Sequence, residues 1–157
     1  MKRRAFIVCL LLLSGCGGKV LEDDYAGPTA TLRDSYGNHV EGGLFTPESI
    51  DVFAVSHVDG KFVENASIKT GYASVGSVYG TGLKPQRFER RVPIKTMTVT
   101  LFGVRHYTGP LEAKTRAQRK VQFRPVAGET YVVRGRIVNG GESSIWIETA
   151  SGKRVAN

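Results

Sequence analysis

The clearest strand pattern in the chain runs from Thr96 to Phe102. Threonines alternate there with Met97, Val99 and Leu101, which is the two-residue period of a strand with one buried face. Further short apolar runs, separated by turn-forming residues, occur at Thr29–Arg33, Ile50–Val58, Lys61–Val63, Val121–Phe123, Tyr131–Val138, Ile145–Ile147 and near Val155. About seven or eight short strands with regular turns predict an all-β domain, a small antiparallel β-sandwich or barrel.

Three of these patterns predict local detail. Ile50–Val58 carries apolar side chains on both faces, so we expect it to lie centrally in its sheet. Asp59-Gly60 between two apolar runs is a strong signal for a tight hairpin. Gly103 follows the alternating strand and is expected to form a bulge there.

Other segments are predicted to lie outside strands. Asp34–Asn38 is a cluster of turn formers. Residues 71–82 hold four glycines and are expected to form a loop. Leu111–Gln118 is the one plausible helical turn, because it contains two alanines and several charges.

The first 16 residues have a different character. Three basic residues at positions 2–4 precede an apolar run, Ala5–Leu13, and this order is typical of a secretory signal peptide. The run is too short to cross a bilayer as a helix, which needs about 20 residues. The end of this stretch, Leu13-Ser14-Gly15-Cys16, resembles the lipobox of bacterial lipoproteins.

That resemblance implies cleavage between Gly15 and Cys16, a diacylglycerol on the Cys16 sulfur and acylation of the new N-terminus. Two or three acyl chains hold a protein stably on a membrane. Gly17, rather than an aspartate, follows Cys16, which by resemblance to the enterobacterial sorting pattern favours the periplasmic side of the outer membrane. An ordinary signal peptide and an uncleaved membrane anchor are the alternatives.

The expected domain organisation follows from this cleavage. Residues 1–15 form the signal peptide, and residues 16–28 form the lipidated cysteine and a flexible tether with Gly and Pro at its ends. Residues 29–157 form the β-sandwich. The remaining 142 residues suit a single domain. They contain no thiol other than Cys16, so cysteine catalysis and cysteine metal sites are excluded.

Charge is distributed unevenly along the chain. The chain from Cys16 onward has 19 Lys and Arg against 14 Asp and Glu, a net charge of +5. Residues 17–64 carry a net −6 and residues 65–157 a net +11. Such asymmetry is typical either of two halves that attract each other or of an anionic partner. A periplasmic location argues against nucleic acid as that partner.

Basic side chains therefore make the strongest candidate surface. It would bind anionic lipid, lipid A phosphates or an acidic polysaccharide, with tyrosines 72, 79 and 107 nearby in sequence. The alternative is a solvated face that protects sheet edges from aggregation. The residues concerned are Arg87, Arg90, Arg91, Arg116, Arg119 and Lys120.

Catalytic and metal-binding patterns are weak in this sequence. Ser74 lies in a glycine-rich segment, but the spacing is wrong for a nucleophile elbow. The histidines, His39, His57 and His106, have no partner at a metal-ligand spacing. Gly80–Lys84 lacks the residues of a phosphate loop. We therefore expect no cofactor, no metal and no enzymatic activity.

A second resemblance concerns the C-terminal half. Residues 121–133 and the segment Ile145-Trp-Ile-Glu resemble small bacterial lipoproteins with transthyretin-like sandwiches, over roughly 35 residues. This resemblance implies a transthyretin- or immunoglobulin-like fold rather than an activity.

The resulting functional expectation is a lipid-anchored envelope protein that acts as a non-catalytic binding or scaffold module, with an envelope protein as a further possible partner. The alternative is an inhibitor or accessory lipoprotein of an envelope or host hydrolase, in which residues 71–82 enter the enzyme's cleft. A hydrolase that uses His57, His106 or Ser74 is a third and weaker reading.

Overall fold

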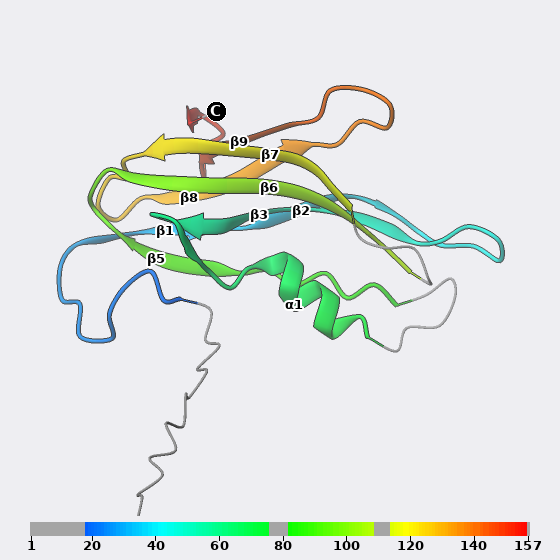
Figure 1. Cartoon of the computed structure of the whole chain (residues 1–157), viewed down its shortest axis with the longest axis horizontal. Coiled ribbons are helices and arrows are strands. Elements are labelled where there is room, and N and C mark those ends of the chain that lie inside the picture. The colour runs from blue at the N-terminus through cyan, green and yellow to red at the C-terminus, as the bar shows by residue number, and fades with distance from the viewer. Residues whose placement is uncertain (1–17, 76–81, 109–113, 157) are drawn as a thin grey trace, which may run out of the picture.

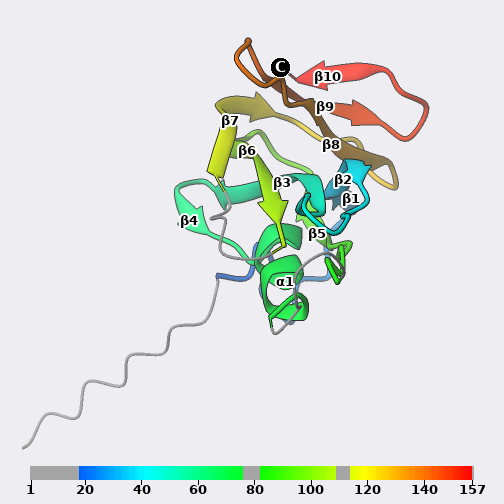
Figure 2. The same cartoon turned by 90° about the vertical axis from the view of Figure 1, so that its right-hand side faces the viewer.

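The computed structural model describes residues 18–75, 82–108 and 114–156. Over these residues the chain forms two β-sheets that pack face to face, with one short helix outside them (Figures 1 and 2). The prediction of an all-β sandwich is confirmed. Ten strands are present in the described residues instead of the seven or eight predicted.

Sheet A contains five strands in the order β10-β9-β8-β1-β5. Its neighbours are antiparallel except for β1 and β8, which run parallel. The strands are β1 (Thr29–Arg33), β5 (Glu89–Pro93), β8 (Thr130–Arg136), β9 (Ser144–Thr149) and β10 (Arg154–Ala156).

Sheet B contains five strands: four follow one another in the order β2-β3-β6-β7, and β4 pairs with β3. All of its pairings are antiparallel. The strands are β2 (Ser35–Val40), β3 (Ser49–Val58), β4 (Lys61–Phe62), β6 (Met97–Tyr107) and β7 (Lys114–Phe123).

The chain passes from sheet A to sheet B at a single residue. Only Asp34 separates β1 from β2, so one extended segment contributes a strand to each sheet. The predicted turn at Asp34–Asn38 is therefore wrong. Its turn-forming residues fit an edge strand with an irregular register, where Asn38 takes a left-handed backbone conformation with φ of 49°.

Several local predictions are confirmed. β3 lies between β2 and β6 and is buried on both faces over most of its length. Asp59 and Gly60, with φ of 49° and 78°, join β3 to β4, as a two-residue hairpin turn requires. The register of β6 against β7 shifts at Gly103, where the bulge was predicted.

The helix prediction is wrong. Lys114–Gln118 belongs to β7, and residues 111–113 lie outside the described residues. The observed helix, α1 (Ala66–Ala73), overlaps the start of the predicted loop at 71–82. It begins where the Asn65 side chain accepts hydrogen bonds from the Ser67 and Ile68 N–H groups, which is the N-cap arrangement.

The main core fills the space between the two sheets. Leu32, Val55, Leu101, Val133 and Ile147 are fully buried there. A second, smaller core lies on the opposite face of sheet B, which is covered by α1 and residues 83–88. It consists of Ile50, Val52, Ala54, Ala66, Leu83 and Val104. Figures 1 and 2 place α1 on the side of the molecule away from β9. Sheet B is thus the middle layer, which explains why β3 is apolar on both faces.

The segment before β1 lies against the sandwich. Gly18 N–H donates to the Phe62 carbonyl at 2.9 Å, and Val20 packs against the main core. A flexible tether was predicted for residues 16–28. Within the described part, residues 18–28, Gly18 and Val20 make these contacts with the domain. Cys16 and Gly17 lie outside the described residues.

Candidate functional site

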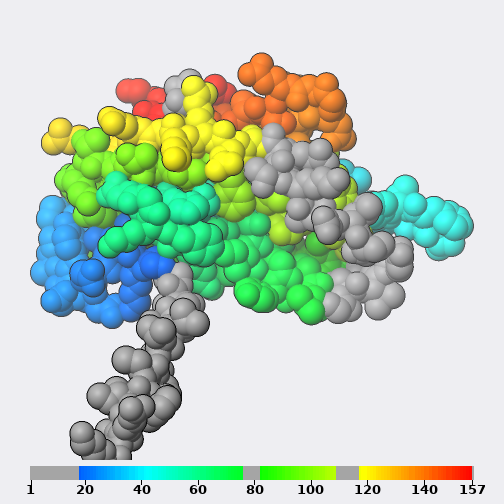
Figure 3. Space-filling model, in the orientation of Figure 1, coloured from blue at the N-terminus to red at the C-terminus, as the bar shows by residue number. Residues whose placement is uncertain are grey.

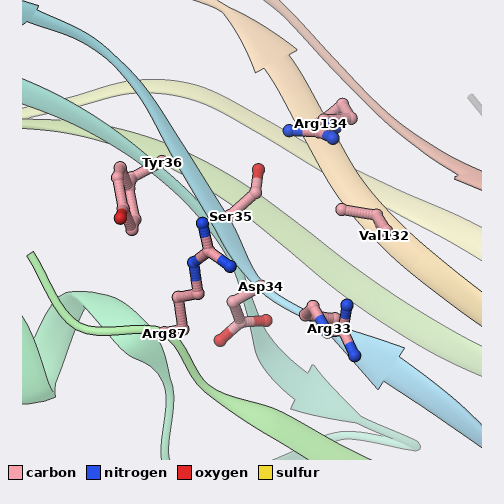
Figure 4. Close-up of a pocket in the computed structure, with 7 residues that line it drawn as sticks. All are labelled: Arg33, Asp34, Ser35, Tyr36, Arg87, Val132 and Arg134. Carbon is pink, nitrogen blue, oxygen red and sulfur yellow. The ribbon is translucent and has the colours of Figure 1, made fainter. Parts of the chain in front are cut away.

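A polar hollow opens where the chain changes sheets. Arg33 and Val132 form the last β1–β8 pair, and after it β1 leaves sheet A while β8 continues. The two strands diverge and leave a space of about 140 Å³ between them. This arginine hollow is lined by Arg33, Asp34, Ser35, Tyr36, Arg87, Val132 and Arg134 (Figure 4).

Three guanidinium groups reach this hollow from three segments. Figure 4 shows Arg33 on β1, Arg134 on β8 and Arg87 on the stretch that leads into β5. Arg33 also contacts Glu89 at 3.0 Å, and Arg134 contacts Glu148 at 3.1 Å. These surface pairs are partly exposed, so each costs little to rearrange around a ligand.

Arg87 is the most available of the three. Its guanidinium carbon lies 5.6 Å from the centre of the Tyr36 ring, which is within cation–π range. Within the described part of the chain Arg87 makes no ion pair, and its side chain is exposed. Its charge is therefore not offset by a bound carboxylate.

The carboxylate of Asp34 is already occupied. It accepts hydrogen bonds from Arg90 Nη2 at 2.7 Å, Ala66 N–H at 3.0 Å and Val55 N–H at 3.2 Å. Burial is the largest influence on this carboxyl and raises its pKa, against the lowering effects of Arg90 and the two backbone N–H groups. Asp34 thus joins both sheets to the start of α1, and the free charges of the hollow are positive.

The candidate basic surface is divided by the fold. Arg87 lines the hollow, and Arg91 is exposed on β5, where it contacts the Thr29 hydroxyl at 3.3 Å. The prediction that Arg90 belongs to this surface is wrong, because its side chain is buried against Asp34. Its inward position arises because β5 alternates and Arg90 falls on the inner face.

The other half of that candidate surface lies on β7. Arg119 and Lys120 are exposed there, and Arg116 lies on the same strand, with its side chain outside the described residues. β7 is an edge of sheet B and β5 is an edge of sheet A, so the structure does not bring the two groups together. Lys and Arg on an edge strand fit the alternative of protection against edge pairing.

Two residues of the hollow were not identified from the sequence. Arg33 and Arg134 lie on two of the predicted strands and were not among the candidate residues. Their convergence depends on the parallel pairing of β1 with β8, which are about 100 residues apart in the chain. No local pattern in the sequence signals that pairing.

The histidines lie apart from one another. His39 Nε2 is 2.6 Å from Glu48, His57 Nδ1 is 3.0 Å from the Ser56 hydroxyl, and His106 Nε2 is 2.9 Å from the Ser67 hydroxyl. Burial lowers the pKa of His106. Across the described ranges, no three His, Cys, Asp or Glu side chains are grouped to hold a metal ion.

Ser74 has a structural role at the end of α1. It is the C-cap residue, and its hydroxyl accepts a hydrogen bond from Lys84 N–H at 3.0 Å. The contact of Ser67 with His106 was not anticipated. This contact joins the first turn of α1 to β6, and its two residues are 39 positions apart in the chain.

A second surface feature is the loop between β2 and β3, residues 41–48. Figure 3 shows this cyan segment projecting from one end of the molecule. Leu44 and Phe45 at its tip are 92% and 94% exposed. Reciprocal backbone hydrogen bonds between Gly43 and Thr46 hold the tip in a tight turn, so the two apolar side chains project from an ordered loop.

The base of this loop is fixed by Glu48. Its carboxylate accepts hydrogen bonds from Gly82 N–H at 2.8 Å, Leu83 N–H at 3.0 Å and the His39 ring at 2.6 Å. Burial alone raises the pKa of Glu48, but the Leu83, His39 and Gly82 donors outweigh it, so the net pKa lies below its ordinary value. Glu48 is therefore held as a carboxylate.

Comparisons of this chain with protein-family models, with curated proteins and with solved structures found no match. The resemblance to transthyretin-like lipoproteins therefore stays a prediction. Within the described ranges, no helix is long and apolar enough to cross a membrane.

Proposed function

We propose that this chain is a lipid-anchored binding module of the bacterial envelope that holds an anionic group in the arginine hollow. The observation that carries the proposal is the convergence of Arg33, Arg87 and Arg134 on one hollow of about 140 Å³. The anchor is supported by the residue pattern of Met1–Cys16. Location on the periplasmic side of the outer membrane is supported by Gly17.

The class of ligand follows from guanidinium chemistry. A planar guanidinium donates two parallel hydrogen bonds to a phosphate or a carboxylate. The hollow is of a size for one such group with part of a sugar or glycerol. Anionic lipid headgroups and phosphorylated or acidic polysaccharides of the envelope carry these groups.

A non-catalytic role fits the chemistry of the lining. Arginine stays protonated in proteins and does not act as a general acid or base. Asp34, the one carboxyl group among the lining residues, is held by three donors. The hollow is thus equipped to hold charge rather than to transfer protons.

Calorimetric titration with glucose 1-phosphate, using the full chain in neutral detergent, tests the binding. We expect Arg87→Gln to weaken binding by about tenfold, because one charge-assisted contact contributes roughly 1.5 kcal/mol or more. Arg91→Gln is the matched control, since it removes an exposed arginine that does not line the hollow. Equal affinity of the two variants would contradict the proposal.

The anchor is tested separately. Cells that express the full chain are labelled with a palmitate analogue, and the N-terminal peptide is examined by mass spectrometry. We expect a diacylglyceryl group on Cys16, and Cys16→Ser should abolish both the label and the cleavage. An unmodified Cys16 in the cleaved protein would exclude a lipid anchor.

The exposed loop tip favours a second candidate function, docking to a protein such as an envelope or host hydrolase. Of the predicted docking segment, residues 71–82, residues 71–73 belong to α1, and residues 76–81 lie outside the described residues. Within the described residues, Leu44 and Phe45 are the most exposed large apolar side chains. Photo-crosslinking from position 45 in intact cells should yield a defined adduct that is absent when the crosslinker is placed at the exposed Gln118.

A further inference from the structure

The N-terminal segment is fixed to the sandwich very close to Cys16. Gly18 N–H donates to the Phe62 carbonyl of β4 at 2.9 Å. A Cβ atom at Gly18 would lie only 3.0 Å from that carbonyl oxygen. Two residues later, Val20 packs against the main core. Gly18 is therefore held on the surface of the β3–β4 hairpin.

The chain length between Gly18 and Cys16 limits how far the domain can be from a lipid on Cys16. An extended chain spans at most about 3.6 Å per residue, so two residues reach roughly 7 Å. A domain joined to acyl chains by so short a connection cannot move clear of the headgroups. It also cannot turn an arbitrary face to them, because Gly18 is held beside β4.

The surface around this point has the composition of a membrane contact. We call it the anchor face and define it by Lys19, Lys61, Phe62 and Lys95, which surround the β3–β4 hairpin; Lys61 and Phe62 are consecutive on β4 and project from its two sides. Phe62 is 47% exposed. The three lysines of the anchor face line one hollow of about 220 Å³ beside the hairpin, together with Glu22 and Asp59. Aromatic rings and long lysine stems of this kind lie at the boundary between headgroups and acyl chains.

The charges on the anchor face are partly offset. Lys95 Nζ lies 3.1 Å from Asp59, and Lys19 Nζ lies 2.6 Å from Asp23. Lys61 makes no ion pair within the described part of the chain, and it is exposed. Attraction to anionic headgroups would therefore come mainly from Lys61, while the lipid on Cys16 would supply the affinity.

We propose that the domain lies directly on the bilayer, with the anchor face against its anionic headgroups. This rests on the proposed lipid at Cys16, and it adds a fixed orientation. β3 extends over ten residues, about 33 Å at 3.3 Å per residue. The anchor face lies at its Val58 end, and Leu44 and Phe45 project beyond its Ser49 end. The loop tip is thereby held away from the membrane that carries the lipid.

Quenching by brominated lipids tests this orientation. The full chain, processed in cells, is reconstituted into vesicles of phosphatidylethanolamine and phosphatidylglycerol brominated near the headgroup. Phe62→Trp and Phe45→Trp each add one exposed indole at opposite ends of β3. Trp146, on β9 and away from β4, gives the baseline in the unsubstituted protein (Figure 2).

We expect the indole added by Phe62→Trp to be quenched about threefold more than the one added by Phe45→Trp, because only the former reaches the lipid boundary. In the Phe62→Trp background, Lys61→Glu should reduce this quenching, whereas Lys84→Glu, an exposed control outside the anchor face, should not. Circular dichroism of each variant shows whether the fold is kept.

Failure of the orientation is distinguishable from failure of the anchor. If mass spectrometry shows a lipidated Cys16 but the indole at position 62 is quenched no more than Trp146, the domain stands clear of the bilayer or is covered there by another protein, and the orientation is wrong. If Cys16 carries no lipid, both the anchor and the orientation are overturned.

Discussion

Asp34 and Arg90 are the two residues on which the change of sheet depends. Both are buried, and Asp34 also accepts hydrogen bonds from β3 and from α1. Nε and Nη1 of Arg90 have no hydrogen-bond partner within the described residues, although its guanidinium lies 5.0 Å from the Phe88 ring centre. A buried pair of this kind is costly to break, since the remaining charge stays unpaired.

The first prediction compares this buried pair with its exposed neighbour on the same two strands. Arg90→Leu should lower the free energy of unfolding by about 3–5 kcal/mol, because Asp34 loses its cation. Arg33→Ala, which removes the exposed contact with Glu89, should cost less than about 1 kcal/mol. Urea unfolding followed by circular dichroism measures both. Similar losses in the two variants would show that Asp34 does not depend on Arg90.

Gly135 marks a close approach in the main core. A Cβ atom there would come within 3 Å of both the Phe53 ring and the Ser144 carbonyl. Gly135→Ala should therefore destabilise the protein by about 1–3 kcal/mol. Gly37→Ala on β2 is the control, because a Cβ atom there meets nothing within 4 Å. A lower melting temperature for both variants alike would argue against the close contact.

Glu48 predicts a pH dependence. Its folded pKa is below the ordinary value of 4.5, so the unfolded chain takes up this proton first as the pH falls. The stabilising contribution is complete above about pH 4.5 and is lost as the pH falls through the folded pKa. Glu48→Gln should flatten the dependence of unfolding free energy on pH in that range. An unchanged slope in the variant would assign the acid sensitivity to other groups.

At the scale of elements, α1 depends on its N-cap. Asn65 is fully buried and accepts from two N–H groups, so Asn65→Ala should cost about 1–2 kcal/mol. Asn65→Ser, which restores a capping oxygen, should recover part of this loss. Hydrogen exchange of the α1 amides locates the effect. Loss of protection elsewhere but not in α1 would contradict a capping role.

The elements that the sequence predicted are those with local signals. Alternation identified β6, an apolar run between turn-forming residues identified β8, and Asp59-Gly60 identified the β3–β4 hairpin. β2 and β5 were missed because their buried positions include polar side chains, Ser35 and Arg90. The burial of Arg90 depends on its contact with Asp34, which is 56 residues away in the chain. α1 was missed because it is short and only Ala66 and Thr70 are buried in it, which gives no apolar stripe.

The candidate site was less predictable than the fold. Arg87 was identified from the density of basic residues, but the same criterion selected Arg90, which is buried, and Arg119, which lies at another edge. A charge count does not distinguish a ligand contact from a buried pair or an edge residue. That distinction requires the strand order, which is set by long-range pairing.

At the scale of the whole molecule, ion pairs within the protein join the acidic first part of the chain to the basic second part. Among the described residues, four ion pairs join an acid of the N-terminal part, up to residue 64, to a base of the part that follows. The pair between Arg105 and Asp51 is the tightest of these, with contacts of 2.6 and 2.9 Å across β6 and β3. The interpretation of two mutually attracting halves is therefore supported for these residues, and the arginine hollow carries part of the remaining positive charge.

The most direct test of the proposed binding follows the arginine side-chain Nε–H resonances by NMR while glucose 1-phosphate is added to the full chain in detergent. We expect saturable shifts of the Nε–H resonances of Arg33, Arg87 and Arg134, whereas the resonance of Arg119 on the β7 edge should not change. Shifts of equal size at Arg119, or no saturable shift at Arg87, would contradict a binding site in the arginine hollow.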